Sequence, residues 1–191
     1  MKRKNSVTPH EVSPARRRLL DTATRLFYQN GIHAVGIDRI IAEADVAKAT
    51  FYKHFPSKDE LVVAYLEEQD RLGRVAVASL PKRPPREMIV AIMQRISDAV
   101  SGGGWRGCPF LNAAAEYPDP ASTVRQAIHA RREWYHRLLQ DHLALAGDPV
   151  PSVTASLLMA LSDGLLESAY LDDTKAIPGL VEEAMRRLVR A

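Results

Sequence analysis

The sequence predicts an all-α fold, and three observations carry this prediction. Apolar residues recur at steps of three and four along most of the 191 residues, which is the spacing of one face of a helix. No run alternates apolar and polar residues with enrichment in β-branched side chains, as a half-buried strand does. All 12 prolines fall in the leader, in junctions or in the first turn of an expected helix, where proline is tolerated.

The first expected helix covers residues 13–30. Ser13 at the N-cap and Pro14 at the first helical position begin it, and Asn30 with Gly31 ends it. Its apolar residues define one buried face: Leu19, Leu20, Ala23, Leu26 and Phe27.

Two short helices are expected next, with a tight turn at Asp45 and Val46 between them. The first of them has an apolar face made by Ile37, Ile40, Ile41 and Ala44, and the second covers residues 47–55 and ends before Pro56. Ser57 and Glu60 then form a capping box that opens a long helix toward Leu80.

The remaining helices are expected at residues 86–101, 110–116, 124–147, 152–171 and 178–190, which makes about nine in total. A glycine-rich loop at residues 102–107 separates the first two of these. One side of the 124–147 helix carries Val124, Ile128, Arg131, Tyr135, Leu138, Leu139, His142 and Leu145.

Composition excludes several classes of protein. No uninterrupted apolar stretch reaches the roughly 18 residues that span a bilayer, and the basic start has no apolar segment behind it. We therefore expect a cytoplasmic protein with no membrane partner. The single cysteine, Cys108, excludes an internal disulfide and a cysteine-based zinc site.

The net charge of +3 conceals two unlike regions. Residues 1–58 contain 11 Lys and Arg against 5 Asp and Glu, a net charge of +6, whereas the rest contains 15 against 18, a net charge of −3. A basic first region suits contact with phosphates.

Three short helices with a tight turn between the second and third are the arrangement of a helix-turn-helix, whose later helix enters the major groove. Phe51 and Phe55 lie four residues apart and are expected to pack inward with Val46. The outward set is rich in groups that donate to phosphates or base edges: Lys48, Ala49, Thr50, Tyr52, Lys53 and His54.

The run that carries this motif, residues 40–61, reads IIAEADVAKATFYKHFPSKDEL. It resembles the signature of the tetracycline-repressor (TetR) family of bacterial transcription regulators. The resemblance implies a helix-turn-helix DNA-binding domain with a basic N-terminal arm at residues 1–58. It also implies a helical domain for effector binding and dimerisation at residues 59–191.

Site residues follow from the resemblance position by position. Thr50, Tyr52 and His54 match recognition-helix residues that contact DNA, and Lys58 matches a phosphate anchor at a helix N-terminus. Lys48, Ala49 and Lys53 stand at variable positions, so the two lysines are candidates for reading guanine edges. Separately from the resemblance, Arg16, Arg17 and Arg18 form a basic cluster in the first helical turns, where cations oppose the helix dipole, so one or more of them, with Arg16 as the candidate, is expected to contact the DNA backbone. Arg39 is also expected to contact DNA, and Lys2, Arg3 and Lys4 are expected to form an arm for a minor groove.

Three positions depart from the family pattern. Asp45 stands in the turn where glycine is usual, and Asp tolerates left-handed backbone better than most residues. Ala47 replaces a serine cap, which lowers the intrinsic stability of the recognition helix by about 1 kcal/mol. Asp38 stands where a polar or basic contact is common, so it either caps the second helix or accepts from a cytosine.

A homodimer is implied for the last two long helices, which form a four-helix bundle with those of a partner in the family. The residues support this expectation with a ridge of small side chains at four-residue steps: Ser156, Ala160, Gly164 and Ser168. Apolar residues accompany the ridge, including Val153, Leu157, Leu161 and Leu165, and Leu180, Ala184 and Leu188 in the final helix. The alternative is an ordinary core within one chain.

A small, unidentified effector is implied for the segment between the long fourth helix and the seventh. Its expected lining is aromatic and apolar, with two polar groups that orient the ligand: Trp105, Phe110, Tyr117, Trp134, Tyr135 and Met159, with Asn112 or Glu116. Cys108 lies beside Arg106, whose charge would lower its pKa and make it a sensor; a small buried apolar role is the alternative.

Two enzyme-like signals are rejected. Gly102, Gly104 and Gly107 have the dinucleotide-binding spacing but follow an amphipathic helix where a strand is required. His129, Glu133 and His136 share a helix face, yet Arg132 and Arg137 beside them would repel a metal cation.

The sequence therefore predicts a non-enzymatic repressor without cofactor or metal. As a homodimer it would bind an inverted repeat in double-stranded DNA, and a small effector would release it. The alternative is a small-molecule-binding protein or enzyme with an incidental helix-turn-helix resemblance.

Overall fold

The computed structural model describes residues 13–172 and 174–189. The predicted arm at Lys2, Arg3 and Lys4 lies outside these residues, as does Arg190 at the predicted end of the last helix. The described part is all-α, as predicted, with nine α-helices, one 3-10 helix and no strand.

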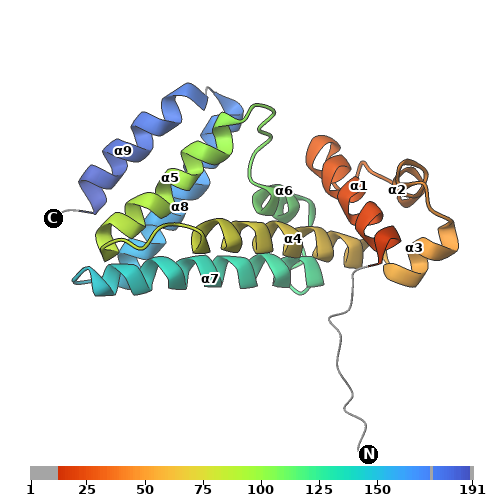
Figure 1. Cartoon of the computed structure of the whole chain (residues 1–191), viewed down its shortest axis with the longest axis horizontal. Helices are drawn as coiled ribbons and strands as arrows, with labels where there is room; N and C mark the ends of the chain where they lie inside the picture. Colours follow the sequence, from red (N-terminus) through yellow and green to blue (C-terminus); the bar gives the residue numbers. More distant parts are fainter. Residues whose placement is uncertain (1–12, 173, 190–191) are drawn as a thin grey trace, which may run out of the picture. The chain divides into compact units, whose positions relative to one another are not determined.

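The helix bounds follow the predicted order (Figure 1). The elements are α1 (Pro14–Asn30), α2 (Ile37–Ala44), α3 (Lys48–His54), α4 (Lys58–Ala78), α5 (Pro85–Ser101), α6 (Pro109–Glu116), α7 (Thr123–Leu145), α8 (Pro151–Leu171), the 3-10 helix η1 (Thr174–Ala176) and α9 (Ile177–Leu188). Helix α4 ends at Ala78, short of Leu80, because the Leu80 N–H turns to the Val77 carbonyl at 3.1 Å in a tighter final turn.

The chain divides into two compact units, the first ending at Leu61 and the second beginning at Val62. The predicted boundary between residues 58 and 59 lies close to this division, inside the first turn of α4. That the two parts act as separate domains stays a prediction.

The first unit is built by packing α1 against α2 and α3. Its core includes the predicted apolar face of α1 together with residues from α2, α3 and the segment that follows α3: Leu19, Ala23, Leu26, Phe27, Ile40, Phe51 and Phe55. These side chains hold the short helix α3, which has only seven residues and is too short to be stable alone.

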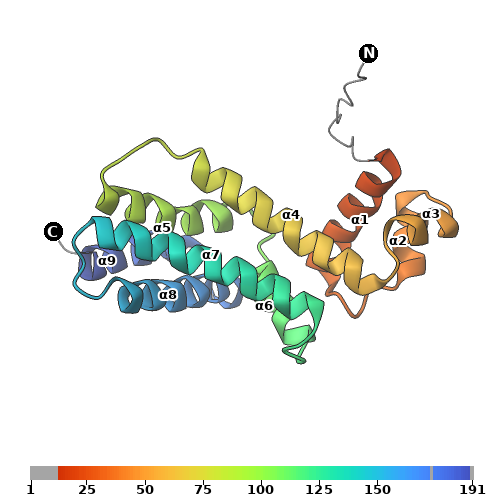
Figure 2. The same ribbon diagram turned by 90° about the horizontal axis from the view of Figure 1, so that it is seen from below.

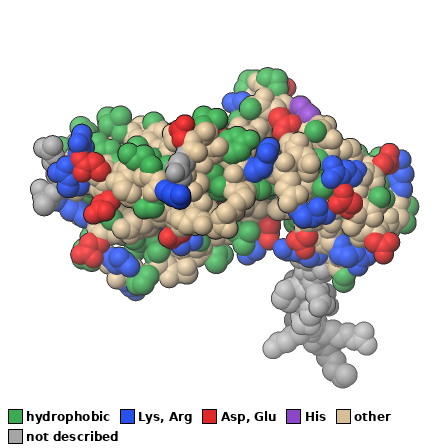
Figure 3. Space-filling model, turned by 90° about the horizontal axis from the view of Figure 1, so that it is seen from above, with side chains coloured by type: hydrophobic (Ala, Val, Ile, Leu, Met, Phe, Trp, Pro, Cys, Tyr) green, Lys and Arg blue, Asp and Glu red, His purple; other side chains and the backbone are tan. Residues whose placement is uncertain are grey.

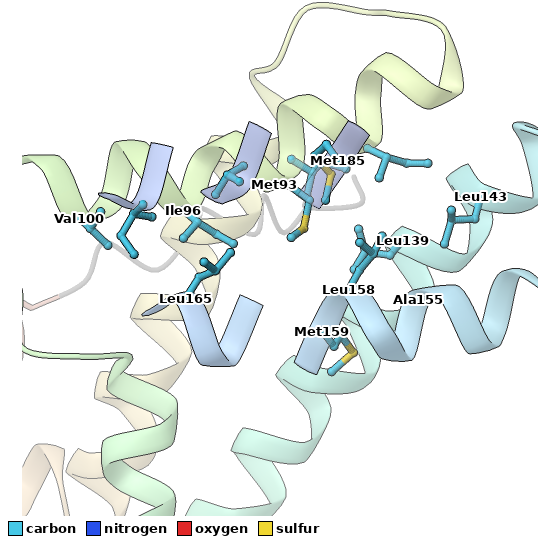
Figure 4. Packing of buried hydrophobic residues seen from close by; sticks show 14 of the residues in the cluster. Met93, Ile96, Val100, Leu139, Leu143, Ala155, Leu158, Met159, Leu165 and Met185 are labelled. Atoms are coloured by element: carbon cyan, nitrogen blue, oxygen red, sulfur yellow. The ribbon is translucent and has the colours of Figure 1, made fainter. Parts of the chain in front are cut away.

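In the second unit, α7 packs against α8, and α5 packs against α7 and α9 (Figures 1 and 2). Their buried side chains meet in one cluster (Figure 4). Met93 and Ile96 of α5 meet Leu139 of α7 and Leu158 of α8 there, and Met185 adds a side chain from α9.

The loop between α5 and α6 contains the glycines of the rejected dinucleotide pattern. Gly103, Gly104 and Gly107 all have positive φ, which glycine adopts without steric cost. A Cβ at Gly107 would lie 3.2 Å from Asn112 Oδ1 and 3.3 Å from Glu167 Oε1. These glycines allow the tight turn of this loop.

Among the described residues, none of the helices combines the length and the apolar character that a membrane span requires.

Candidate functional site

The turn between α2 and α3 depends on Asp45. This residue adopts a left-handed conformation, with φ 50° and ψ 60°, and is the one non-glycine residue of the described chain with positive φ. Asp tolerates this region better than most residues. The Asp45 and Val46 N–H groups donate to the carbonyls of Ala42 and Ile41, so the turn closes with its backbone paired.

Helix α3 begins without a side-chain cap, because Ala47 offers no acceptor. The Ala47 carbonyl accepts from the Thr50 N–H at 2.9 Å and from the Phe51 N–H at 3.1 Å, which starts the helix through backbone bonds alone. Packing therefore supplies the stability that the cap does not.

Helix α3 has one buried and one exposed face, as predicted. Phe51 is fully buried and Phe55 is 2% exposed, and their rings lie 6.2 Å apart. Lys48, Ala49, Tyr52 and Lys53 are exposed, whereas Thr50 and His54 are half-buried. The exposed side chains are donors or small groups, the types that meet phosphates and base edges.

Lys48 has an acidic partner on this face. Its Nζ lies 3.1 Å from Asp38 Oδ1 of α2, and this carboxylate raises the pKa of the Lys48 ammonium above its usual range. The alternative in which Asp38 caps α2 is wrong, because the N-cap of α2 is Gly36 and this helix has no capping hydrogen bond from a side chain. Asp38 is already the acceptor of an ion pair, a partnership that no sequence signal indicates.

Two predicted DNA contacts are held by other residues of the first unit. His54 Nε2 lies 3.3 Å from Ser13 Oγ, and the Arg16 guanidinium lies 5.0 Å from the centroid of the Phe55 ring. Ser13 occupies the N-cap position of α1 but makes no capping bond with its side chain. Both contacts position a cationic or polar group next to α3.

Arg39 belongs to an exposed network on α2. Its Nε donates to Glu43 Oε1 at 2.8 Å, and Arg25 donates to Glu43 Oε2 at 2.7 Å. These two hydrogen bonds lower the pKa of Glu43, which therefore stays ionised. The network carries one more positive than negative charge.

Lys58 is half-buried at the first position of α4. The predicted cap before it is confirmed, because the Glu60 N–H donates to Ser57 Oγ at 3.1 Å. Lys58 therefore stands where the positive end of a helix dipole and the first amides of the helix favour an anion.

The second unit contains a cavity of about 290 Å³ between α4, α5, α6, α7 and α8. Five of the predicted effector residues line it: Trp105, Cys108, Phe110, Tyr135 and Met159. Its walls are mostly apolar, and its volume is at the lower end of the range for small-molecule pockets, which begins at about 300 Å³.

The other residues predicted for the pocket do not line this cavity. Trp134 lies against the Arg74 and Arg131 guanidinium groups, 4.4 and 4.6 Å from its ring centroid. The Asn112 side chain turns back to donate to the Arg106 carbonyl at 2.8 Å. Tyr117 is buried, and Glu116 is half-buried at the end of α6.

Arg131 is one of several cavity residues that the pocket prediction missed. It is four-fifths buried, and its guanidinium lies against the Phe110, Trp134 and Tyr135 rings. The available signal was its place on the apolar side of the 124–147 helix, where an arginine needs a partner.

Cys108 does not have the environment of a sensor. Burial raises the pKa of its thiol, and the expected lowering by Arg106 does not occur. The Arg106 guanidinium lies 5.5 Å from the Tyr170 ring centroid instead. Cys108 is a protonated thiol on the cavity wall.

The predicted dimer residues are largely uncovered in one chain. Val153 and Leu157 of α8 are 57% and 53% exposed, and Leu180 of α9 is 50% exposed. Ser156, Ala160, Gly164 and Leu188 are also exposed, whereas Leu161, Ser168 and Ala184 are half-buried. Leu165 packs into the core. Figure 3 shows one face of the molecule on which hydrophobic side chains reach the surface among charged ones.

The polar face of α7 holds His129 3.7 Å from Glu133, and His136 next to the Ser152 carbonyl and Ser156 hydroxyl. Arg132 does not lie free beside them, because it pairs with Asp163 at 2.9 Å. No group of three His, Cys, Asp or Glu in the described ranges is arranged to hold a metal ion.

Comparison with known proteins extends this picture. Residues 19–65 match the family model described as bacterial regulatory proteins, tetR family. A crystal structure of a TetR-family transcriptional regulator from Streptomyces coelicolor superposes with a TM-score of 0.86 and 42% identity, covering 92% of this chain and 94% of that one.

Two curated relatives are also similar. The transcriptional regulator LmrA of Bacillus subtilis is 31% identical over 125 residues, which are 63% of this chain and 66% of the relative. The transcriptional repressor KstR of Rhodococcus jostii is 35% identical over 142 residues, or 69% of this chain and 65% of the relative. The chain thus matches just under two thirds of the length of each.

Proposed function

Since the chain belongs to the tetR family of bacterial regulatory proteins and is a transcriptional regulator rather than an enzyme, we propose that it is a homodimeric, effector-released repressor. Each protomer inserts α3 into the major groove of one half of an inverted repeat. Because this partner is the bacterial chromosome, the protein acts in the cytoplasm.

The observation that carries the proposal is that helix α3 has one buried face and one exposed face rich in hydrogen-bond donors. Phe51 and Phe55 fix the helix from within, so that the exposed side chains of Lys48 and Lys53 face outward from a rigid support. Tyr52, 44% exposed, and half-buried His54 flank them as donors to the sugar-phosphate backbone. Lys58 anchors a phosphate at the N-terminus of α4.

The proposed dimer covers the exposed apolar residues of α8 and α9. Leaving Val153, Leu157 and Leu180 in water is unfavourable, and burying them against the same surface of a second copy removes that cost. The small residues Ser156, Ala160 and Gly164 let the partner helix approach closely. A two-fold axis also fits an inverted repeat.

The cavity in the second unit is the proposed effector site. Repression ends when effector binding shifts the dimer to a state whose two heads no longer match the spacing of the half-sites. Linkage makes the effect reciprocal, so operator DNA weakens effector binding by the same factor.

Binding to the DNA upstream of the protein's own gene and of its neighbours tests the proposal. Purified protein should prefer one inverted repeat over unrelated DNA by about a thousandfold or more. Its affinity should fall steeply with salt, because Lys and Arg displace counterions from phosphates. Absence of both properties would favour the small-molecule-binding alternative.

Removal of the gene then separates repression from activation. Expression of the gene next to the bound repeat should rise in the deletion strain and fall again on complementation. A fall on deletion would contradict repression while leaving operator binding intact.

A further inference from the structure

The polar groups of the cavity in the second unit differ in whether they are already paired. Asp163, its acidic residue, accepts from Arg132 at 2.9 and 3.1 Å. The indole N–H of Trp105 donates to the Leu166 carbonyl at 2.9 Å. Arg95 donates to Asp98 at 2.8 Å. Arg131 and Tyr135 are two further polar residues of the lining.

Arg131 is a buried cation with incomplete compensation. Within residues 13–172 and 174–189, its Nη1 is buried and has no hydrogen-bond partner. Its Nε lies 3.2 Å from Asp70 Oδ1, but the two atoms are not aligned for a hydrogen bond. Asp70 Oδ2 also accepts a hydrogen bond from Arg74 Nε at 2.7 Å, so one carboxylate lies between two guanidinium groups.

The group of Arg74, Asp70 and Arg131 therefore carries one uncompensated positive charge in a mostly buried position. Burial lowers the pKa of Arg131, yet arginine stays protonated in proteins. The aromatic rings of Phe110, Trp134 and Tyr135 stabilise the guanidinium through their faces but accept no full hydrogen bond. An unpaired buried N–H of a charged group is costly.

Tyr135 stands one helical turn after Arg131, so both side chains lie on the same face of α7. Its hydroxyl has only long contacts, 3.4 Å to Ser162 Oγ and 3.6 Å to the Met93 sulfur. Ser162 Oγ donates to the Leu158 carbonyl at 2.8 Å, so it is the acceptor in its long contact with Tyr135. Burial raises the pKa of Tyr135, which keeps the phenol protonated and able to donate.

Arg131, with an unpaired N–H, and Tyr135, with one long hydrogen bond, thus line the same apolar cavity, and a ligand that binds both must bring acceptors and a negative charge. We propose that the effector is a small monocarboxylate with an apolar body, whose carboxylate is bound by the Arg131 guanidinium and the Tyr135 hydroxyl. This inference rests on the proposed effector site and names its ligand class.

Charge and size favour a carboxylate over a phosphate ester. The uncompensated charge in the Arg74, Asp70 and Arg131 group is one, which a carboxylate balances, whereas a phosphate monoester brings about −1.5 to −2 at neutral pH. The cavity of about 290 Å³ also limits the apolar body to a small one. Phe110, Trp105 and Met159 supply its contacts.

Paired acids and amides test the inference. Phenylacetate, 4-phenylbutyrate and octanoate are each compared with the neutral amide of the same length, by calorimetry on the full chain at neutral pH without DNA. At least one acid should bind about tenfold more tightly than its amide, because charge-assisted hydrogen bonds are the stronger ones. Equal binding of acid and amide in all three pairs would overturn the inference, as would no binding of any.

Substitutions in the cavity show which side chain causes the preference for the acid over the amide. Arg131→Gln should remove the acid preference and leave amide binding within about twofold, and Tyr135→Phe should reduce the preference by several fold. Arg95→Gln is the matched control, since it removes the same charge from another cavity residue already paired with Asp98. An acid preference that survives Arg131→Gln, or falls equally in Arg95→Gln, contradicts the assignment. If Arg131→Gln does not fold, Tyr135→Phe decides.

Operator binding by the same preparations keeps the two hypotheses apart. Protein that binds its operator but shows no acid preference refutes the ligand class and leaves the regulator intact. Protein that prefers the acid but binds no operator refutes the proposed repressor function and leaves the cavity assignment standing.

Discussion

At the scale of single residues, the Asp38–Lys48 ion pair limits the charge that Lys48 would present to DNA in the proposed complex. Both side chains are largely exposed, at 84% and 64%, so their ion pair adds little to stability. Its expected effect is on DNA binding. In the proposed complex, Lys48 must leave Asp38 or share it to contact a base edge or a phosphate, and the carboxylate itself then lies close to a polyanion.

Asp38→Asn should therefore strengthen DNA binding. The substitution frees Lys48 and removes a repulsive charge, so affinity at low salt should rise several fold. The slope of log affinity against log salt should steepen by about 0.9 for each protomer that gains a phosphate contact. Fluorescence anisotropy at several salt concentrations measures both quantities.

Asp98→Asn is the matched control, because Asp98 is an exposed partner of Arg95 in the second unit. It should leave both affinity and slope unchanged. A loss of affinity in Asp38→Asn would mean that Asp38 positions Lys48 for the groove, which contradicts the view that it restrains the lysine.

Cys108 should react slowly with thiol reagents. Burial raises the pKa of its thiol, so the reactive thiolate is scarcer at pH 7.5 than in an ordinary cysteine of pKa about 8.5. Labelling by a disulfide reagent, followed by absorbance, should be slower than labelling of glutathione. The rate should still be rising at pH 9, and denaturant should abolish the difference. Fast labelling of the native protein at neutral pH would restore the sensor hypothesis.

At the scale of helices, the sequence predicts which face of a helix is buried better than it predicts which residues that face contacts. The apolar periodicity and the cap at Ser57 placed α1 to α4 because both signals are local. Trp134 and Tyr135 show the limit of a local signal. Adjacent residues point about 100° apart on a helix, so only one of the pair faces the cavity, and tertiary packing decides which.

The same limit applies to pairing between elements. The Asp38–Lys48 and Asp70–Arg131 contacts join different helices, so the spacing of residues along one helix does not predict them. The end of α4 was missed for a related reason, because its last turn closes through tight backbone bonds that have no strong residue signal.

Helix α3 and the start of α4 should divide the work of DNA binding. Lys58→Ala should weaken binding to all sequences about equally, because a phosphate anchor carries no base information. Lys48→Ala and Lys53→Ala should change the preference among half-site variants, at about 1–3 kcal/mol for each base edge that the lysine no longer reads. Competition against a library of single-base operator variants measures this. Equal, sequence-independent losses in all three variants would refute the division into readers and an anchor.

At the scale of the whole molecule, a basic first region and an apolar surface on α8 and α9 have complementary roles in the proposed mechanism. The net charge of +6 in residues 1–58 draws each protomer to DNA without regard to sequence. Joining two protomers makes the second half-site contact intramolecular, which raises affinity by a factor of about 10² to 10⁴ in the general case. Operator specificity therefore depends on residues that touch no DNA.

Leu157→Glu should test this dependence. Leu157 is 53% exposed in one chain, so a glutamate there leaves the fold of the protomer intact but places two like charges at a two-fold interface. Sedimentation should show a monomer, and affinity for the full inverted repeat should fall on the order of a hundredfold while affinity for a single half-site stays the same. Leu145→Glu is the control, because Leu145 is 73% exposed at the end of α7, outside the proposed interface. A dimeric Leu157→Glu protein would place the two-fold contact elsewhere. A monomeric one that still binds the full repeat with undiminished affinity would separate dimerisation from operator recognition, because half-site contacts alone would then account for the binding energy.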